Sequence, residues 1–324
     1  GKTLQVIETT LNGSKVVALE DTDVSKVGIP KVRLNPAVGI VEIANGCMSE
    51  CTFCQTKLAK GDLQSYRIGD ITRQIKQELA DGCKEVWLSS TDNGCYGLDI
   101  GEDLSSLIDQ VVQIPEDFRI RVGMMNPMFM PRIRDNLLKS FENDKVFRFL
   151  HVPVQSGSND VLNNMKRGHT VETFKNVVKK FRDKFGTFTI STDVIVGYPT
   201  ETEDDFEKTI SLLKETRPDI INHSRYSQRP GTNAAEMPQI DMSEIKRRSK
   251  RLFALVNEIS FSNNKKWIGW EGLVLFDETS DGQIKGRNYA YKPIFVKEAV
   301  TIGQKNQVRI VDVTNHSLIG EVLS

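Results

Sequence analysis

The sequence predicts an α/β protein: a partial (β/α)6 barrel followed by a small C-terminal β-barrel. Two observations lead to this prediction. Apolar, β-branched runs alternate with helical stretches through most of the chain, which is typical of a parallel sheet with crossover helices. Beyond about residue 266 only short strand-like runs broken by turn residues follow, which is typical of a small closed barrel.

The first part of the chain is expected to contain six strands with helices between them. The strands are predicted at 38–44, 85–90, 119–124, 147–154, 188–196 and 219–224. The helices are predicted at 70–80, 103–113, 131–141, 171–185 and 202–216, and Thr202 is a candidate cap for the last of them. This series can form an open sheet or a partial barrel, and it is too short for a complete eightfold barrel.

Changes in composition divide the chain into four segments. Residues 1–36 lack a long period and are expected to be a linker or the remnant of a preceding domain, because a chain that opens on Gly1 is interpreted as a fragment. Residues 37–240 form the predicted barrel. Residues 241–266 read as a basic connecting helix, with apolar residues at helical spacing. Residues 267–324 form the predicted small β-barrel.

Composition indicates an ordinary globular protein, with 324 residues that are 39% hydrophobic and 27% charged. No apolar run approaches the roughly 18 residues of a membrane span, and the first residues lack the layout of a signal peptide, so a cytoplasmic location is expected. The net charge is zero, but residues 246–324 carry 13 Lys and Arg against 8 Asp and Glu. The C-terminal end is therefore basic, as a nucleic-acid partner would require.

Three of the five cysteines, Cys47, Cys51 and Cys54, follow the first predicted strand with C-x3-C-x2-C spacing. An odd number of cysteines argues against a disulfide framework. A structural zinc site normally needs four ligands, and Cys83 and Cys95, which flank the second predicted strand, are not expected to share a metal with the loop. The better interpretation is a [4Fe-4S] cluster held by three cysteines, with one iron open to another ligand.

This loop resembles that of the radical S-adenosylmethionine (SAM) superfamily, in which the open iron binds SAM. The resemblance implies that Phe53 packs beside the adenine of SAM, and that a donor such as ferredoxin or flavodoxin supplies the electron. Plain core packing of Phe53 is the alternative. Three further stretches, "HVPVQSGSNDVLNNMKRGHT", "TDVIVGYPTETEDDF" and "YSQRPGTNAAEM", look like landmarks of the methylthiotransferase family. "KEVWLSSTDNGCYGLDIG" and "GRNYAYKPI" are most similar to the archaeal and eukaryotic branch acting on N6-threonylcarbamoyladenosine next to the anticodon of tRNA.

Polar residues at the carboxyl ends of the predicted strands are the further candidates for SAM binding, because ligands bind at that edge of such sheets. Asp193 is an acid inside an apolar run and therefore needs a partner. Gly157 is expected to let the backbone approach a ligand closely. Surface turns, caps and buried structural residues are the alternatives at each position. Besides Phe53, the cofactor candidates at these ends are Thr91, Asp92, Asn93, Asn126, Gln155, Ser156, Asp193, Gly197 and Pro199. Lys166 and Arg167 follow a predicted short helix, and the family resemblance implies that Arg167 approaches the SAM carboxylate or the substrate; a solvated surface charge is the alternative.

The C-terminal segment resembles the TRAM module, a small RNA-binding β-barrel, and interleaves basic and aromatic residues. The candidate substrate and RNA contacts are Arg225, Arg229, Arg287, Tyr289, Tyr291 and Lys292. The family resemblance also implies a preceding domain with a second [4Fe-4S] cluster, which this sequence does not contain. The alternatives are a methylthiotransferase for a ribosomal protein and a catalytically incomplete RNA-binding Fe-S fragment.

Overall fold

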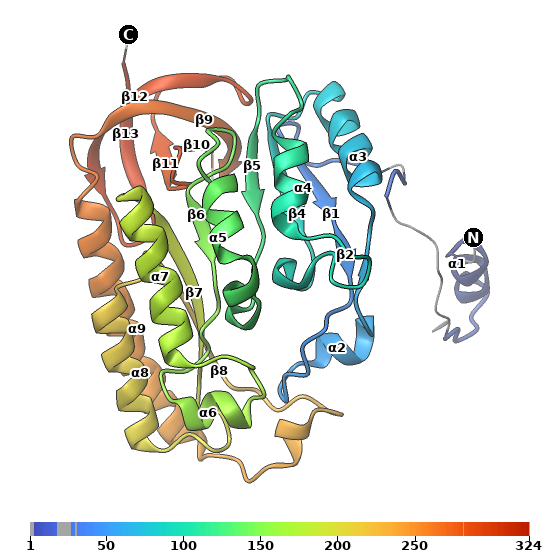
Figure 1. The fold of residues 1–324 in the computed structure, drawn as a ribbon, viewed down its shortest axis with the longest axis vertical. Coiled ribbons are helices and arrows are strands. Elements are labelled where there is room, and N and C mark those ends of the chain that lie inside the picture. Colours follow the sequence, from blue (N-terminus) through green and yellow to red (C-terminus); the bar gives the residue numbers. More distant parts are fainter. Residues whose placement is uncertain (1–2, 18–26, 30, 281, 324) are drawn as a thin grey trace.

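The computed structural model describes residues 3–17, 27–29, 31–280 and 282–323, and these form a curved parallel sheet, a long helix and a small β-barrel. Figure 1 shows the sheet at the centre with helices on its outer side and the small barrel at the top. The cysteine loop lies at the opposite end, near α2 and α6. The small barrel therefore covers one end of the sheet, and the cysteine loop lies at the other.

The described strands of the sheet run parallel in the order β1, β4, β5, β6, β7, β8. Their bounds are β1 (Val38–Glu42), β4 (Glu85–Ser89), β5 (Arg119–Val122), β6 (Phe149–His151), β7 (Thr189–Val196) and β8 (Ile220–Arg225). Two three-stranded ladders meet where Phe147 N donates to Ile120 O at 3.0 Å and Met125 N donates to His151 O at 2.9 Å. Within the described residues no ladder joins β1 to β8, so the sheet is a partial barrel.

Helices cover the outer face of this sheet. They are α3 (Ile68–Ala80), α4 (Leu104–Val111), α5 (Met130–Ser140), α7 (Val171–Phe185) and α8 (Glu203–Thr216), close to the five predicted helices. Thr202 caps α8 as predicted, because its side chain accepts from Asp205 N at 3.2 Å while Thr202 N donates to the Asp205 carboxylate at 3.0 Å. Alternation along each strand sends one set of side chains to the helices and the other into the barrel.

Short elements line the end of the barrel that carries the cysteine loop. They are β2 (Ala44–Asn45), α2 (Gln55–Lys60), β3 (Gln64–Ser65), α6 (Asn159–Asn164) and the 3-10 turns Asn93–Cys95, Pro127–Phe129 and Asn233–Glu236. The sequence pattern did not predict these elements, except for a short helix before Lys166, because they are too short to show a period.

The helix α9 (Met242–Lys265) leads from the sheet to the C-terminal barrel. The barrel is closed, with strand order β10-β11-β13-β12-β9. Its strands are β9 (Glu271–Ser280), β10 (Gln283–Arg287), β11 (Pro293–Val296), β12 (Lys305–Val313) and β13 (Leu318–Val322). Leu252 and Ile259 on α9 are fully buried against the sheet domain, whereas Val274, Phe276 and Ile294 fill a separate barrel core.

The small barrel docks on the amino-terminal ends of the parallel strands. Tyr291 sits between Phe147 and Phe149, with ring centroids 4.9 and 5.0 Å away. Lys292, which is 3% exposed, donates to Asn264 at 3.0 Å and lies 3.5 Å from Asp219. Aromatic packing and a buried ion pair together fix the barrel to the sheet domain, because an unpaired buried charge would be costly.

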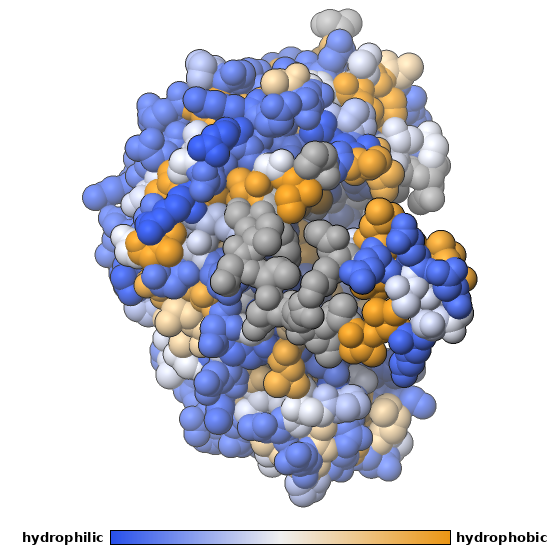
Figure 2. Space-filling model, turned by 90° about the vertical axis from the view of Figure 1, so that its right-hand side faces the viewer, coloured by the Kyte–Doolittle hydropathy of each residue, from blue (hydrophilic) through white to orange (hydrophobic). Residues whose placement is uncertain are grey.

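The N-terminal segment lies apart from this core. Helix α1 (Thr3–Leu11) has no buried residue, and Leu11, Val32 and Leu34 are all largely exposed. In Figure 2, hydrophobic patches interrupt the mainly hydrophilic surface on the side where this segment lies. Of the predicted linker 1–36, residues 1–2, 18–26 and 30 lie outside the described residues, and α1 was not foreseen. A search of the described helices found none with the length and apolar character of a membrane span.

Candidate active site

The cysteine loop leaves the sheet just after β2 and is held by backbone contacts at both ends. Cys47 N donates to Gly61 O at 3.3 Å, and Thr52 N donates to Met165 O at 3.1 Å. Gly46 has φ +68°, and a Cβ there would lie 1.8 Å from the carbonyl oxygen of Asp62. Only glycine fits this position, so the start of the loop has a single backbone path.

All three cysteines of the loop are free thiols, and their environments differ. Hydrogen bonding with Cys95 is the main reason that the pKa of Cys47 is lowered to about 6, although burial opposes this; Ser49 N also donates to its sulfur at 3.3 Å. Burial raises the pKa of Cys51, and the charge and hydrogen bond of Arg167 oppose this rise. Cys54 N donates to Cys51 O at 3.0 Å, so these two cysteines lie in one turn of the loop.

Arg167 is the buried cation of the site. It is 6% exposed, its Nη1 donates to Cys51 Sγ at 3.0 Å, and its Nη2 donates to Pro153 O at 3.3 Å. Its Nε has no partner among the described residues. The predicted cofactor candidate Arg167 is therefore beside the cysteine loop, where its charge favours thiolates and a further acceptor is needed for Nε.

The thiol of Cys95 lies beside the loop, since the ligand atoms of Cys47, Asp92 and Cys95 are all within 4.8 Å of one another. Cys95 follows β4 and therefore reaches the same edge of the sheet as the loop. Whether it shares a metal with the loop stays a prediction, and none was expected to be shared. Cys83 precedes β4 and lies against Glu78 instead, 3.9 Å away.

The three polar residues predicted after β4 have different hydrogen-bond surroundings. Asp92 is 2% exposed and its Oδ1 accepts from Gly94 N and Asn126 N at 2.9 and 3.0 Å. The amide of Asn93 is fully buried and donates to Leu88 O at 2.9 Å. These two side chains shape the loop rather than face a ligand. Thr91 differs, because its buried hydroxyl has no hydrogen-bond partner among the described residues.

The candidates after β5 and β6 also differ, because some hold neighbouring loops in position and others are available to a ligand. Asn126 donates to Ser49 Oγ at 3.1 Å and so braces the cysteine loop, a role that the sequence did not show for Ser49. Ser156 is fully buried and accepts from Ser158 N at 3.2 Å. Gly157 packs against α8, where a Cβ would lie 2.4 Å from Thr209 Cα, which corrects its predicted role at a ligand. Gln155 has φ +71°, an unusual conformation for a residue other than glycine.

The candidates around β7 include one polar residue inside the barrel and several packing residues. Asp193 finds its expected partners in His151 and Asn222. Gly197 has φ +79°, and a Cβ there would lie 2.5 Å from a side-chain atom of Ile245, so its close approach is to α9. Pro199 is buried, and Phe53 packs against a small apolar cluster that includes Tyr198.

The predicted RNA contacts lie in two places. Arg225 and Arg229 are exposed at and beyond the end of β8. In the small barrel only Tyr289 combines partial exposure with a neighbouring cation, because the Arg148 guanidinium lies 5.3 Å from its ring. Arg287 is half-buried 3.5 Å from Asp277. Tyr291 and Lys292 are buried in the domain junction, which corrects their assignment as surface contacts.

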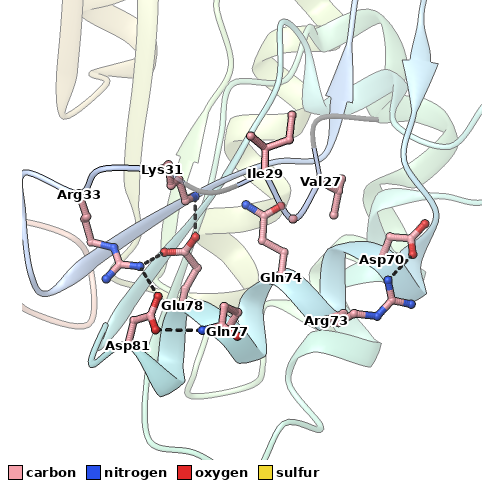
Figure 3. A pocket seen from close by; sticks show the side chains of 11 residues that line it. Val27, Ile29, Lys31, Arg33, Asp70, Arg73, Gln74, Gln77, Glu78 and Asp81 are labelled. Atoms are coloured by element: carbon pink, nitrogen blue, oxygen red, sulfur yellow. Dashed lines mark hydrogen bonds and ion pairs between the residues drawn. The ribbon is translucent and has the colours of Figure 1, made fainter. Parts of the chain in front are cut away.

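A cavity of about 730 Å³ lies apart from this site, between residues 27–29 and 31–33 and helix α3. Figure 3 shows that its walls are charged, with Lys31 and Arg33 both paired to Glu78 at 2.5 Å. None of the predicted cofactor or RNA residues lines it. Its charged groups are already paired with one another.

Comparisons with known proteins match both parts of the chain. The radical SAM superfamily profile matches residues 41–213, and the TRAM domain profile matches residues 254–323. Coproporphyrinogen III oxidase from Escherichia coli, a radical SAM enzyme, shares the fold with a TM-score of 0.53 and 12% identity over 90% of this chain and 73% of that chain. Fold and site thus define a radical SAM protein with a C-terminal TRAM domain.

The sequence relatives are more specific. The probable threonylcarbamoyladenosine tRNA methylthiotransferase of Pyrococcus abyssi (strain GE5 / Orsay) is 39% identical over 99% of this chain and 76% of that protein. The threonylcarbamoyladenosine tRNA methylthiotransferase of Drosophila melanogaster is 37% identical over 99% of this chain and 60% of that protein. This chain belongs to the threonylcarbamoyladenosine tRNA methylthiotransferase family.

The residues present fit the cofactors of the superfamily, a [4Fe-4S] cluster and SAM. An all-sulfur donor set of three free thiols suits an Fe-S cluster with one open iron. The buried Thr91 hydroxyl and the Arg167 Nε both lack partners among the described residues, and Arg167 stands next to the sulfur of Cys51. Buried polar atoms without partners are uncommon in folded proteins and indicate a missing ligand or water.

Proposed function

We propose that this protein is a radical SAM enzyme that converts N6-threonylcarbamoyladenosine in tRNA to its 2-methylthio derivative. The observation that carries the proposal is the hydrogen bond from the buried Arg167 to Cys51, in a loop that also carries Cys47 and Cys54 and in a chain that belongs to this family. Membership of the family gives the substrate class. The geometry supplies a place for the cofactors at the open end of the barrel.

Cys47, Cys51 and Cys54 would hold the cluster, and Thr91, Gln155 and Arg167 are the best-placed groups for SAM. When bound, the cluster supplies the electron that cleaves SAM. The cleavage of SAM supplies the oxidising power of the reaction. The Arg167 guanidinium, fixed by Pro153 O and Cys51 Sγ, would offer a positive charge to an anionic cluster or to the SAM carboxylate. Asp92, Asn93 and Asn126 keep the surrounding loops in position.

The tRNA would approach the carboxyl ends of the strands, where the exposed side chains of Arg225 and Arg229 can contact phosphates. The TRAM barrel adds a second contact through Tyr289 and Arg148, which pair an aromatic face with a cation. The electron would come from a small donor such as ferredoxin or flavodoxin. The expected second cluster would belong to a preceding domain, and the assay below supplies methanethiolate as the sulfur source.

The test is an anaerobic assay of reconstituted protein with SAM, dithionite, methanethiolate and tRNA that carries threonylcarbamoyladenosine. We expect 5′-deoxyadenosine and the 2-methylthio nucleoside, both measured by mass spectrometry. Cys51→Ala should abolish both products. Cys83→Ala is the matched control, because this cysteine is buried on the far side of β4 from the loop.

Three results would count against the proposal. Release of 5′-deoxyadenosine that does not respond to tRNA but rises with a ribosomal protein substrate would move the activity to that class. Binding of tRNA without any 5′-deoxyadenosine, at about four irons per chain, would indicate an RNA-binding Fe-S protein. Equal activity of Cys51→Ala and the parent would refute the assignment of the cluster.

A further inference from the structure

A cavity of about 370 Å³ lies at the junction of the two domains, at the end of the sheet opposite to the cysteine loop. It is formed where three helices end, because Gly186 follows α7, Arg217 follows α8 and Lys266 follows α9. Tyr289 of the small barrel also lines it. Cavities of this size are large enough for small-molecule and cofactor ligands.

Three aromatic residues line one part of this junction cavity. The ring centroid of Trp267 lies 5.7 Å from that of Trp270 and 5.9 Å from that of Tyr289. The centroids of Trp270 and Tyr289 are 6.1 Å apart. Trp267 is buried in the core of the small barrel, whereas Trp270 and Tyr289 pack against that core and are only partly buried. These two rings therefore keep aromatic surface that a planar ligand can cover.

Three polar side chains of the junction cavity have unused hydrogen-bonding capacity. Among the described residues, no ion pair or hydrogen bond reaches the Arg217 guanidinium, and Lys266 Nζ donates only to Asn263 Oδ1, at 3.1 Å. The buried Thr189 hydroxyl has no partner within the described part of the chain. Arg217 also has φ +41°, a left-handed conformation in which glycine is the usual residue after a helix. An arginine held in this conformation points to a use for its side chain.

The acidic and carbonyl groups around the junction cavity are already paired. Glu215 lies 2.6 Å from Lys175, and Asp219 lies 3.5 Å from Arg182. Arg182 Nη2 also donates to Arg217 O at 2.8 Å, which offsets the partial negative charge at the end of α8. The charge that remains available to a ligand is therefore positive. It favours an anion and disfavours a lysine side chain or a quaternary ammonium group.

A second, smaller cavity adjoins the first at Tyr289. It has a volume of about 220 Å³, and Arg119, Arg148 and Asp144 also line it. The Arg148 guanidinium lies 5.3 Å from the Tyr289 ring. Cations therefore lie in both cavities next to one aromatic side chain. Proteins that bind single-stranded nucleic acids combine these features, because the bases stack on aromatic rings while cations contact the phosphates.

We propose that the junction cavity binds one unpaired nucleotide of the RNA substrate. Its base stacks on Trp270 and Tyr289, and Arg217 and Lys266 contact its phosphate. The bases of a duplex are paired and stacked on one another, so the site selects single-stranded RNA. Stacking tolerates every base, so little sequence preference is expected. The inference deepens the proposed function and rests on it for the identity of the RNA.

The position of the junction cavity separates this nucleotide from the modified adenosine. Strand β7 begins at Thr189, which lines the cavity, and ends at Val196 on the edge of the sheet that carries the cysteine loop. At about 3.3 Å per residue the two ends are about 23 Å apart, which corresponds to about seven stacked nucleotides. The junction cavity is therefore a second anchor for the RNA and not part of the reaction site.

The test measures the affinity of the full chain for a labelled single-stranded RNA of about eight nucleotides, by fluorescence anisotropy. Trp270→Leu should weaken binding about tenfold, and Trp270→Phe should retain it. Arg217→Gln should reduce the slope of log affinity against log salt by about one unit. Phe261→Leu and Lys214→Gln are the matched controls, because they change an exposed aromatic residue and an exposed cation outside the cavity. Both controls should bind like the parent.

Two results would overturn the inference. One is an affinity and a salt slope in Trp270→Leu and Arg217→Gln that equal those of the parent. The other is equal binding of a blunt duplex of the same sequence. If denaturant unfolding shows that Trp270→Leu is destabilised, the partly exposed and unpaired Arg217 decides the question through its own variant. Loss of the 2-methylthio product with RNA binding that still depends on Trp270 would refute the proposed function and retain this site.

Discussion

Replacing Gly46 by alanine tests how the backbone of the cysteine loop determines cluster binding. The added Cβ would lie 1.8 Å from Asp62 O and 2.5 Å from Asp62 C. Both are backbone atoms, so no side-chain rotation relieves the contact. The φ of +68° adds strain for any residue with a Cβ, about 1–2 kcal/mol. Overpacking against backbone adds about 1–3 kcal/mol more.

The two terms together predict that Gly46→Ala loses about 2–5 kcal/mol. The chain relieves this strain by opening the loop where Cys47 N donates to Gly61 O at 3.3 Å, which displaces the first cluster ligand. We therefore expect low iron content after anaerobic reconstitution and earlier unfolding in denaturant. Gly101→Ala is the matched control, since Gly101 has φ +75° but a Cβ added there would meet no atom within 4 Å. Normal cluster loading in Gly46→Ala, or equal destabilisation of both variants, would refute this reasoning.

Three other predictions concern RNA binding and the domain junction. The double variant Arg225→Ala/Arg229→Ala should weaken tRNA binding and reduce the slope of log affinity against log salt by about one to two units. Arg73→Ala on α3 should change neither quantity. An unchanged slope for the double variant in filter binding would exclude phosphate contacts. Tyr289→Leu should weaken tRNA binding about tenfold, whereas Tyr289→Phe should retain it, and equal affinities of the two variants would exclude stacking. Burial and the neighbouring Asp277 raise the pKa of Glu85 to about 8. Between pH 4.5 and 8 the folded chain therefore keeps a proton that the unfolded chain loses, and the free energy of unfolding falls as pH rises through this range. Glu85→Gln should remove this fall, at up to about 1.4 kcal/mol per pH unit, and parallel stability–pH curves for variant and parent would contradict it.

The sheet and the cysteine loop could be predicted from the sequence because both depend on local patterns. Strand alternation and helix periodicity identify the elements, and the Cys47–Cys51–Cys54 spacing identifies a three-sulfur ligand set. The carboxyl-end rule also selects Thr91 and Gln155 as ligand candidates, a prediction that stays open, whereas Arg167 was indicated by the family resemblance alone. The need for a partner at Asp193 was also apparent, since an acid in an apolar strand is rarely left unpaired.

Orientation and domain docking could not be predicted in this way. A run such as Arg287–Lys292 has the same basic and aromatic composition whether it faces RNA or another domain, and only packing shows that Tyr291 and Lys292 are buried. The side chains of Asp92 and Asn93 turn inward and form hydrogen bonds with backbone groups. The identity of these two residues does not predict that orientation. The approach of Cys95 to Cys47 depends on where β4 lies in the sheet, and spacing along the chain does not show it.

The barrel uses the inward face of a single strand for two purposes. Phe147 and Phe149 hold Tyr291 of the small barrel, and His151 follows at the next inward position beside Asp193. The same alternation holds on β4, where Glu85 meets the small barrel and Trp87 stacks with Arg121 at 4.9 Å. Docking of the TRAM barrel therefore closes the amino-terminal end of the sheet. Truncation of Tyr291 would remove its ring contacts with both Phe147 and Phe149 and loosen this junction, without any change in the cysteine loop at the opposite end.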